Sequence, residues 1–120
     1  MDEAPALDSY SLTEKLVLLA IADAVVCEET PVASVDIKPR CEGLLEHVDA
    51  TVVSRPGESD IMRALGVLGT EPYVDELRQS TSPTGKGRPQ YGLATDPDVV
   101  LAALERDDRL GDAVEFVTEQ

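Results

Sequence analysis

The chain has 120 residues, a hydrophobic content of 42 %, and a formal net charge of −14 from 24 acidic and 10 basic residues. This length is sufficient for one domain with a modest core and is short for two, and the hydrophobic content excludes a disordered chain. The longest apolar run, Leu16–Ala22, is far below the roughly 20 residues that span a bilayer. The acidic start also lacks the basic region of a signal peptide, so we expect a cytoplasmic protein that does not enter a membrane.

The charge is informative about the environment and the partners of the protein. Only three bases are lysine (Lys15, Lys38 and Lys86). This acid-rich, lysine-poor composition is similar to that of cytosolic proteins of extreme halophiles, where surface carboxylates maintain hydration and salt screens their repulsion. The alternative interpretation is an ordinary acidic protein. The same charge opposes DNA binding, which relies on neutralising phosphates and weakens as salt is added. An acidic protein in concentrated salt must therefore bind DNA through a local basic patch and direct base contacts, or not bind it.

Residues 1–10 carry acids and a proline and are expected to form a flexible tail. Ser11 with Glu14 three residues later is a capping box, which predicts that a helix begins here. Up to Cys27, this helix carries apolar side chains on nearly all of its faces, so we expect the helix to be buried. It should end ahead of Pro31, since proline disfavours helix at the preceding residue.

Residues 31–35 are predicted to be a short strand or a linker. The next helix is predicted over residues 38–48. Its apolar residues follow the helical spacing i, i+3, i+4 and i+7, and they are Cys41, Leu44, Leu45 and Val48.

A third helix is predicted to end at Gly69. Ser54 is a candidate N-cap with Pro56 in the first turn, whereas Gly57 favours a later start at Ser59. The predicted inward stripe is Ile61, Met62, Leu65 and Leu68, and the opposite face is predicted to carry Ser59, Arg63 and Gly66, with Arg55 just ahead of the helix.

A β-hairpin is predicted next, with strands over residues 73–80 and 90–95. Its tip, residues 81–89, contains two prolines, two glycines and the bases Lys86 and Arg88. Asp96 is then a good N-cap with Pro97 at the first helical position, and the apolar face of this helix continues to Arg106. One or two further amphipathic turns are expected from Leu110, Ala113, Val114 and Val117.

These elements predict a mainly α fold with a small antiparallel β-hairpin (α+β), arranged as a winged helix-turn-helix. Residues 11–112 would form the domain, residues 1–10 a tail, and residues 113–120 a C-terminal tail or helix end.

Several segments together resemble one protein family, the archaeal Orc1/Cdc6 replication-initiator proteins. Leu12–Ile21 resembles the opening helix of their C-terminal winged-helix domain, and Leu65–Gly69 matches the Leu-x-x-Leu-Gly end of its third helix. Gly85-Lys86-Gly87-Arg88 with Tyr91-Gly92-Leu93 resembles its wing. The segments 96–104 and 106–110 resemble its ending, so that the resemblance covers roughly residues 10–112.

The resemblance implies a domain that binds double-stranded origin DNA, with the third helix in the major groove and the wing at the minor groove. The positions that it implies for DNA contact are Arg55, Ser59, Arg63, Lys86 and Arg88. The chain departs from the family in lacking a preceding ATPase module and in placing Glu58 and Asp60 beside the reading face. We therefore expect a stand-alone relative with weakened, altered or lost DNA binding.

Two functions from different classes follow. In a DNA-binding protein, Lys86 and Arg88 would contact the phosphates and Arg63 with Arg55 would contact guanine. In a protein-interaction adaptor, the two bases of the tip would simply be solvated, and Arg63 and Arg55 would pair with neighbouring carboxylates. The sequence leaves the DNA target, the protein partner and the oligomeric state open.

Other chemistry is not expected. Thr84–Gly87 fails the phosphate-loop pattern, because Ser80 and Gly87 stand where that pattern requires glycine and Ser or Thr, so no nucleotide site is predicted. Cys27 and Cys41 are expected to be buried free thiols. His47 is the sole histidine and is expected at a helix end on the surface, so we predict no metal site, no cofactor and no enzymatic activity.

Overall fold

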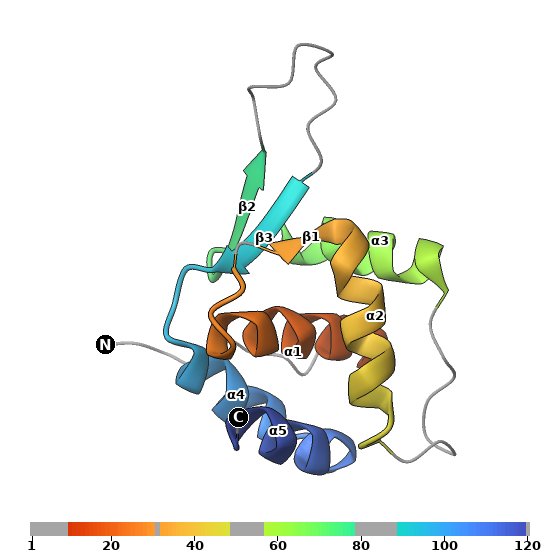
Figure 1. The fold of residues 1–120 in the computed structure, drawn as a ribbon, viewed down its shortest axis with the longest axis vertical. Helices are drawn as coiled ribbons and strands as arrows, with labels where there is room; N and C mark the ends of the chain where they lie inside the picture. The colour runs from red at the N-terminus through yellow and green to blue at the C-terminus, as the bar shows by residue number, and fades with distance from the viewer. Residues whose placement is uncertain (1–9, 31, 49–56, 79–88, 120) are drawn as a thin grey trace.

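The computed structural model describes residues 10–30, 32–48, 57–78 and 89–119. The described part of the chain is mostly helical with a small three-stranded antiparallel sheet, which confirms the α+β expectation (Figure 1). The helices are α1 (Leu12–Val26), α2 (Ser34–Leu45), α3 (Glu58–Leu68), α4 (Pro97–Glu105) and α5 (Gly111–Thr118), with a 3-10 turn, η1 (Asp108–Leu110), before α5. The strands are β1 (Val32–Ala33), β2 (Val74–Arg78) and β3 (Pro89–Leu93). No described helix is both long and apolar enough to cross a membrane.

Helix α1 lies at the centre of the fold. Its predicted capping box is present, with the Ser11 hydroxyl accepting from the Glu14 N–H and the Glu14 carboxylate accepting from the Ser11 N–H. Ten consecutive residues, from Lys15 to Ala24, are buried, as the all-round apolar pattern predicted. The sheet and α3 lie on one side of α1, and α4 and α5 lie on the other (Figure 1).

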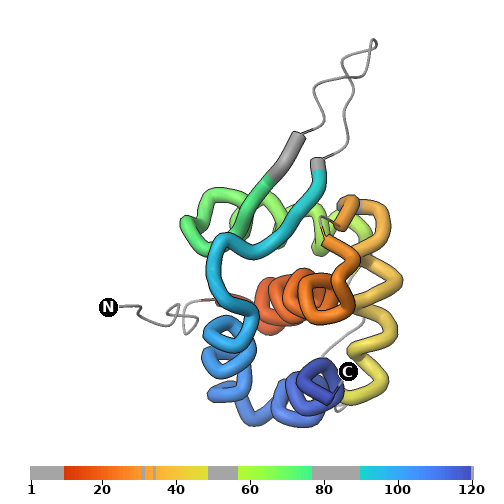
Figure 2. The backbone as a smooth tube through the Cα atoms, turned by 60° about the vertical axis from the view of Figure 1, so that its left-hand side comes forward, coloured from red at the N-terminus to blue at the C-terminus, as the bar shows by residue number. Residues whose placement is uncertain are grey.

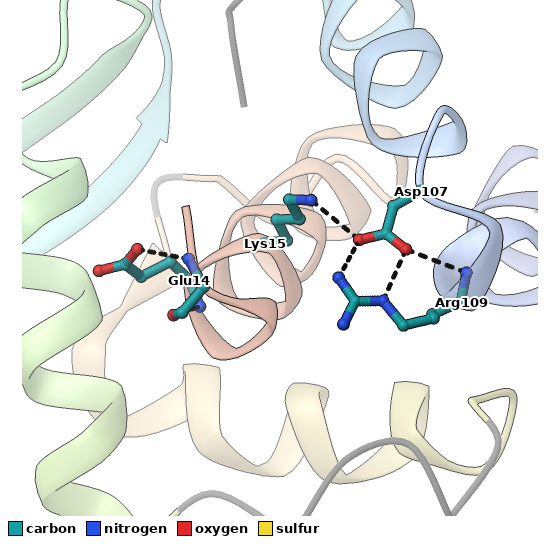
Figure 3. A network of polar contacts seen from close by, with 5 residues as sticks. Glu14, Lys15, Asp107 and Arg109 are labelled. Atoms are coloured by element: carbon teal, nitrogen blue, oxygen red, sulfur yellow. Dashed lines mark hydrogen bonds and ion pairs between the residues drawn. The ribbon is translucent and has the colours of Figure 1, made fainter. Parts of the chain in front are cut away.

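The two charged residues within this buried stretch both have ionic partners. The Lys15 Nζ lies 2.8 Å from the Asp107 carboxylate, which also receives the Arg109 guanidinium at 2.6 Å (Figure 3). Near the other end of α1, the Asp23 carboxylate lies 2.6 Å from the Arg40 Nη1. A buried charge is costly unless paired, so these contacts are what allow α1 to be surrounded on all sides.

The end of α1 is closed by a Schellman motif. The Glu29 N–H donates to the Ala24 carbonyl and the Glu28 N–H to the Val25 carbonyl. Glu28 has φ 59°, the left-handed conformation in which glycine is usual. The predicted end near Cys27 is therefore correct, but a glutamate occupies the strained position.

The predicted start of the second helix at residue 38 was wrong, because α2 begins at Ser34 directly after the two-residue β1. Pro39 lies inside α2, where it cannot donate to the carbonyl four residues earlier. Burial of Ile37, Cys41 and Leu44 along one stripe favours the helix despite that lost hydrogen bond. The short-strand alternative for residues 31–35 applies to Val32 and Ala33.

The sheet has the order β1-β3-β2, with both pairs antiparallel. The hairpin is present, with Val74 opposite Leu93 and Glu76 opposite Tyr91, and Val32 of β1 also pairs with Tyr91. The third strand was not part of the predicted hairpin. The tip predicted at 81–89 lies, apart from Pro89, outside the described residues.

The C-terminal region packs on α1. Asp96 caps α4 by accepting from the Asp98 N–H, and Pro97 is at the start of the helix, as predicted. Residues 113–118, expected to be a tail or helix end, form most of α5 and bury Ala113, Val114 and Val117.

Candidate nucleic-acid interface

Helix α3 exposes the face that the sequence singled out. Its buried stripe is Ile61, Ala64, Leu65 and Leu68, and Ser59, Arg63 and Gly66 are exposed. Met62, predicted to point inward, is 46 % exposed. The prediction for Met62 was wrong because Ala64 occupies the place against the core, and a stripe can be shifted by one position without losing helical spacing.

The exposed face of α3 has small residues and one base at its middle. At 100° per residue, Ser59, Arg63 and Gly66 lie between Met62 on one flank and Val67 on the other. Val67 is 36 % exposed. Such a face allows close approach of a partner at its centre and offers one cation and two apolar contacts.

The end of α3 leads directly into the hairpin. Turn hydrogen bonds from Thr70 to Val67 and from Glu71 to Leu68 connect the helix to β2. Gly69, the predicted stop, has a right-handed conformation, so a left-handed cap is not the reason for glycine here. A Cβ at Gly69 would lie 2.6 Å from the Glu76 carboxylate, so a side chain at that position would displace Glu76.

This connection places the base of the hairpin beside α3. Both views show β2 and β3 leaving the body next to α3 and pointing away from α4 and α5 (Figures 1 and 2). The exposed face of α3 and the start of the hairpin therefore belong to the same end of the molecule.

Two of the five predicted DNA-contact residues are described. Ser59 and Arg63 both lie exposed on α3, one helical turn apart. Arg55, Lys86 and Arg88 lie outside the described residues.

The bases of the described chain fall into two groups. Lys15, Arg40 and Arg109 belong to ion pairs, and Arg40 joins both Asp23 and Glu29. Hydrogen bonds from Arg109 and Lys15 hold the pKa of the Asp107 carboxyl well below its usual range, despite the opposing effect of burial. Among the described residues Arg63, like Lys38 and Arg106, makes no ion pair, so its charge is available to a partner.

Glu58 and Asp60, the two acids predicted as alternative partners of Arg63, do not pair with it in the described part of the chain. The Asp60 carboxylate accepts the Gly57 N–H at 3.0 Å and so caps the start of α3.

The remaining candidates for chemistry lie elsewhere. Cys41 is a buried free thiol, and burial raises its pKa to about 12, which disfavours the reactive thiolate. Cys27, predicted to be buried, is half-buried, and its thiol donates to the Asp23 carboxylate. His47, past the end of α2, is stacked on Phe116 of α5, a contact between residues far apart in sequence that helix periodicity does not reveal. The described residues contain no group of three or more His, Cys, Asp or Glu side chains suited to a metal ion.

Comparison of the chain with known protein families, with curated proteins and with solved structures found no match.

Proposed function

We propose that this protein is a winged helix-turn-helix domain that binds double-stranded DNA, with α3 in the major groove and the hairpin along the backbone. The observation that carries the proposal is the exposed Ser59–Arg63–Gly66 face of α3 at the end of the molecule from which the hairpin extends. A helix of this width fits the major groove, where an arginine can donate two hydrogen bonds to guanine. The resemblance of the sequence to the Orc1/Cdc6 winged-helix domain points in the same direction.

The distribution of bases along the chain supports the proposal. Half of the 10 bases lie within residues 55–88, a stretch that contains α3 and β2. They are Arg55, Arg63, Arg78, Lys86 and Arg88. Three other bases are held in ion pairs on the far side or at the end of α1. An acidic protein would thus keep a small number of bases for one surface.

Few phosphate contacts imply a weak dependence on salt. With about three bases reaching phosphates, the logarithm of the association constant should fall with the logarithm of salt concentration with a slope of roughly −3. An association constant that falls more steeply with salt would be too low for DNA binding in concentrated salt. Base contacts by α3 would then supply most of the affinity.

The test is binding of a pool of random duplexes, followed by selection, between 0.15 and 2 M KCl. We expect selected sequences to be retained and the double substitution Arg63→Ala with Arg88→Ala to abolish retention. The matched control is Lys38→Ala with Arg106→Ala. It also removes two positive charges, but from α2 and from the residue after α4, and it should leave DNA binding unchanged. Equal loss in both double variants, or no selected sequence at any salt, would refute the proposal.

A second candidate function is a protein-interaction adaptor that uses the same face of α3. The exposed side chains of Met62 and Val67, with Glu58 and Asp60 at the start of the helix, favour a protein partner over a polyanion. In that case Met62→Ser should release the partner, while Arg63→Ala with Arg88→Ala should leave it bound. Co-purification of the wild-type chain and both variants separates the two functions.

A further inference from the structure

A groove lies between the end of α2 and α5, on the opposite side of α1 from α3. It has a volume of about 540 Å³. One wall is formed by the residues just past the end of α2, Glu46, His47 and Val48. The other is formed by Asp112, Glu115 and Phe116 of α5 and by Glu119, which follows its last residue. These four residues follow the spacing i, i+3, i+4 and i+7, so they share the outward face of that helix, opposite the buried Ala113, Val114 and Val117.

An aromatic pair joins the two walls of the groove. The rings of His47 and Phe116 are stacked with their centres 4.1 Å apart and an angle of 21° between their planes. Phe116 is nevertheless 40 % exposed. An aromatic ring that keeps this much surface in water, although it is stacked on one side, offers a contact to a further group.

The charge of the groove indicates which kind of chemical group could contact the Phe116 ring. Four of the seven lining residues are carboxylates, compared with 24 acids among the 120 residues of the chain, and none of these described lining residues is a lysine or arginine. The groove is therefore more acidic than the average of this acidic protein. A cation that can also stack on an aromatic ring is complementary to it, and the arginine guanidinium has both properties.

We propose that this groove binds an arginine-containing segment of a partner protein, with a guanidinium against Phe116 and its charge facing the carboxylates of α5 and Glu46. The surface is separate from the face of α3 and does not depend on the proposed DNA binding. Concentrated salt strongly screens exposed ion pairs, since the screening length is about 3 Å at 1 M. The aromatic contact should persist there.

Fluorescence anisotropy of a labelled twelve-residue peptide of alternating glycine and arginine tests the proposal at 0.15 and 2 M KCl. Phe116→Ala and Phe116→Leu should each weaken binding about fivefold at both salt concentrations, because both remove the aromatic face and the second keeps apolar volume. Glu115→Gln with Glu119→Gln should weaken binding about fivefold at 0.15 M and less than twofold at 2 M.

Two controls are matched to these variants. Val35→Ala removes an exposed apolar side chain from the other end of α2, and Glu58→Gln with Glu105→Gln removes two carboxylates outside the groove. Both should bind the peptide within about twofold of the wild type. Equal binding by Phe116→Leu and the wild type, or equal loss in the control variants, would overturn the proposal. Self-association of the wild type that Phe116→Ala abolishes would also overturn it, by identifying a second copy as the occupant.

Discussion

Helices α1 and α3 use charge in opposite ways. In α1, the stretch from Lys15 to Ala24 is buried, and its two charged residues form ion pairs with Asp107 and Arg40. In α3, one stripe is buried and Arg63 is exposed without an ion pair among the described residues. Lys15 and Asp23 therefore help to hold α1 against its neighbours, whereas Arg63 stays on the surface, on the face proposed to bind a partner.

The largest expected effect is on the free energy of unfolding, and it compares a buried position of α1 with an exposed position of α3. Leu19→Ala in α1 should lower the free energy of unfolding by about 3–4 kcal/mol, because it creates a cavity at a fully buried position. Met62→Ala on the exposed face of α3 should change it by less than about 1 kcal/mol. Denaturant unfolding at constant KCl measures both, and equal losses would mean that α3 is buried in an assembly.

An intermediate effect is expected at the charged end of α1. Asp107→Asn should cost about 2 kcal/mol at pH 7, less than a fully buried ion pair, because Arg109 remains in solvent. The folded protein holds the pKa of Asp107 below its unfolded value of about 3.9. Its stabilising contribution is therefore complete at neutral pH and is lost as the pH falls through and below that value.

The measurement for Asp107 is the difference in unfolding free energy between wild type and Asp107→Asn as a function of pH. That difference should be constant from pH 7 to about 5 and decrease below about 4. Taking a difference cancels the titration of the other carboxylates. A difference that grows on acidification would contradict the assigned role of the carboxylate.

The smallest expected effect has the opposite sign. Glu28→Gly should stabilise the protein by about 1 kcal/mol, because glycine adopts the left-handed conformation after α1 without strain. Glu28→Ala removes the same charge but keeps the strain, so it separates conformational from electrostatic effects. Equal melting temperatures for the glycine and alanine variants would show that charge, and not φ, decides this position.

Much of the fold could be predicted from local patterns. The capping box at Ser11, the Asp96–Pro97 start of α4 and the hairpin all follow from residues only a few positions apart. The start of α2 could not be predicted, since Pro39 argues locally against a helix that Ile37 stabilises through burial.

The candidate site was predicted only in part. The exposure of Ser59 and Arg63 follows from helical spacing, whereas Met62 was assigned to the wrong side. The groove between α2 and α5 was missed, because His47 and Phe116 meet only when the two helices pack.

The sequence alone determined where most helices and strands begin and end, because caps, prolines and apolar spacing act over one or two turns. Only the tertiary structure decided that Lys15 meets Asp107, that β1 pairs with β3, and that Phe116 stacks on His47. These contacts join residues that are distant in the chain, and their stability depends on how several elements pack at once.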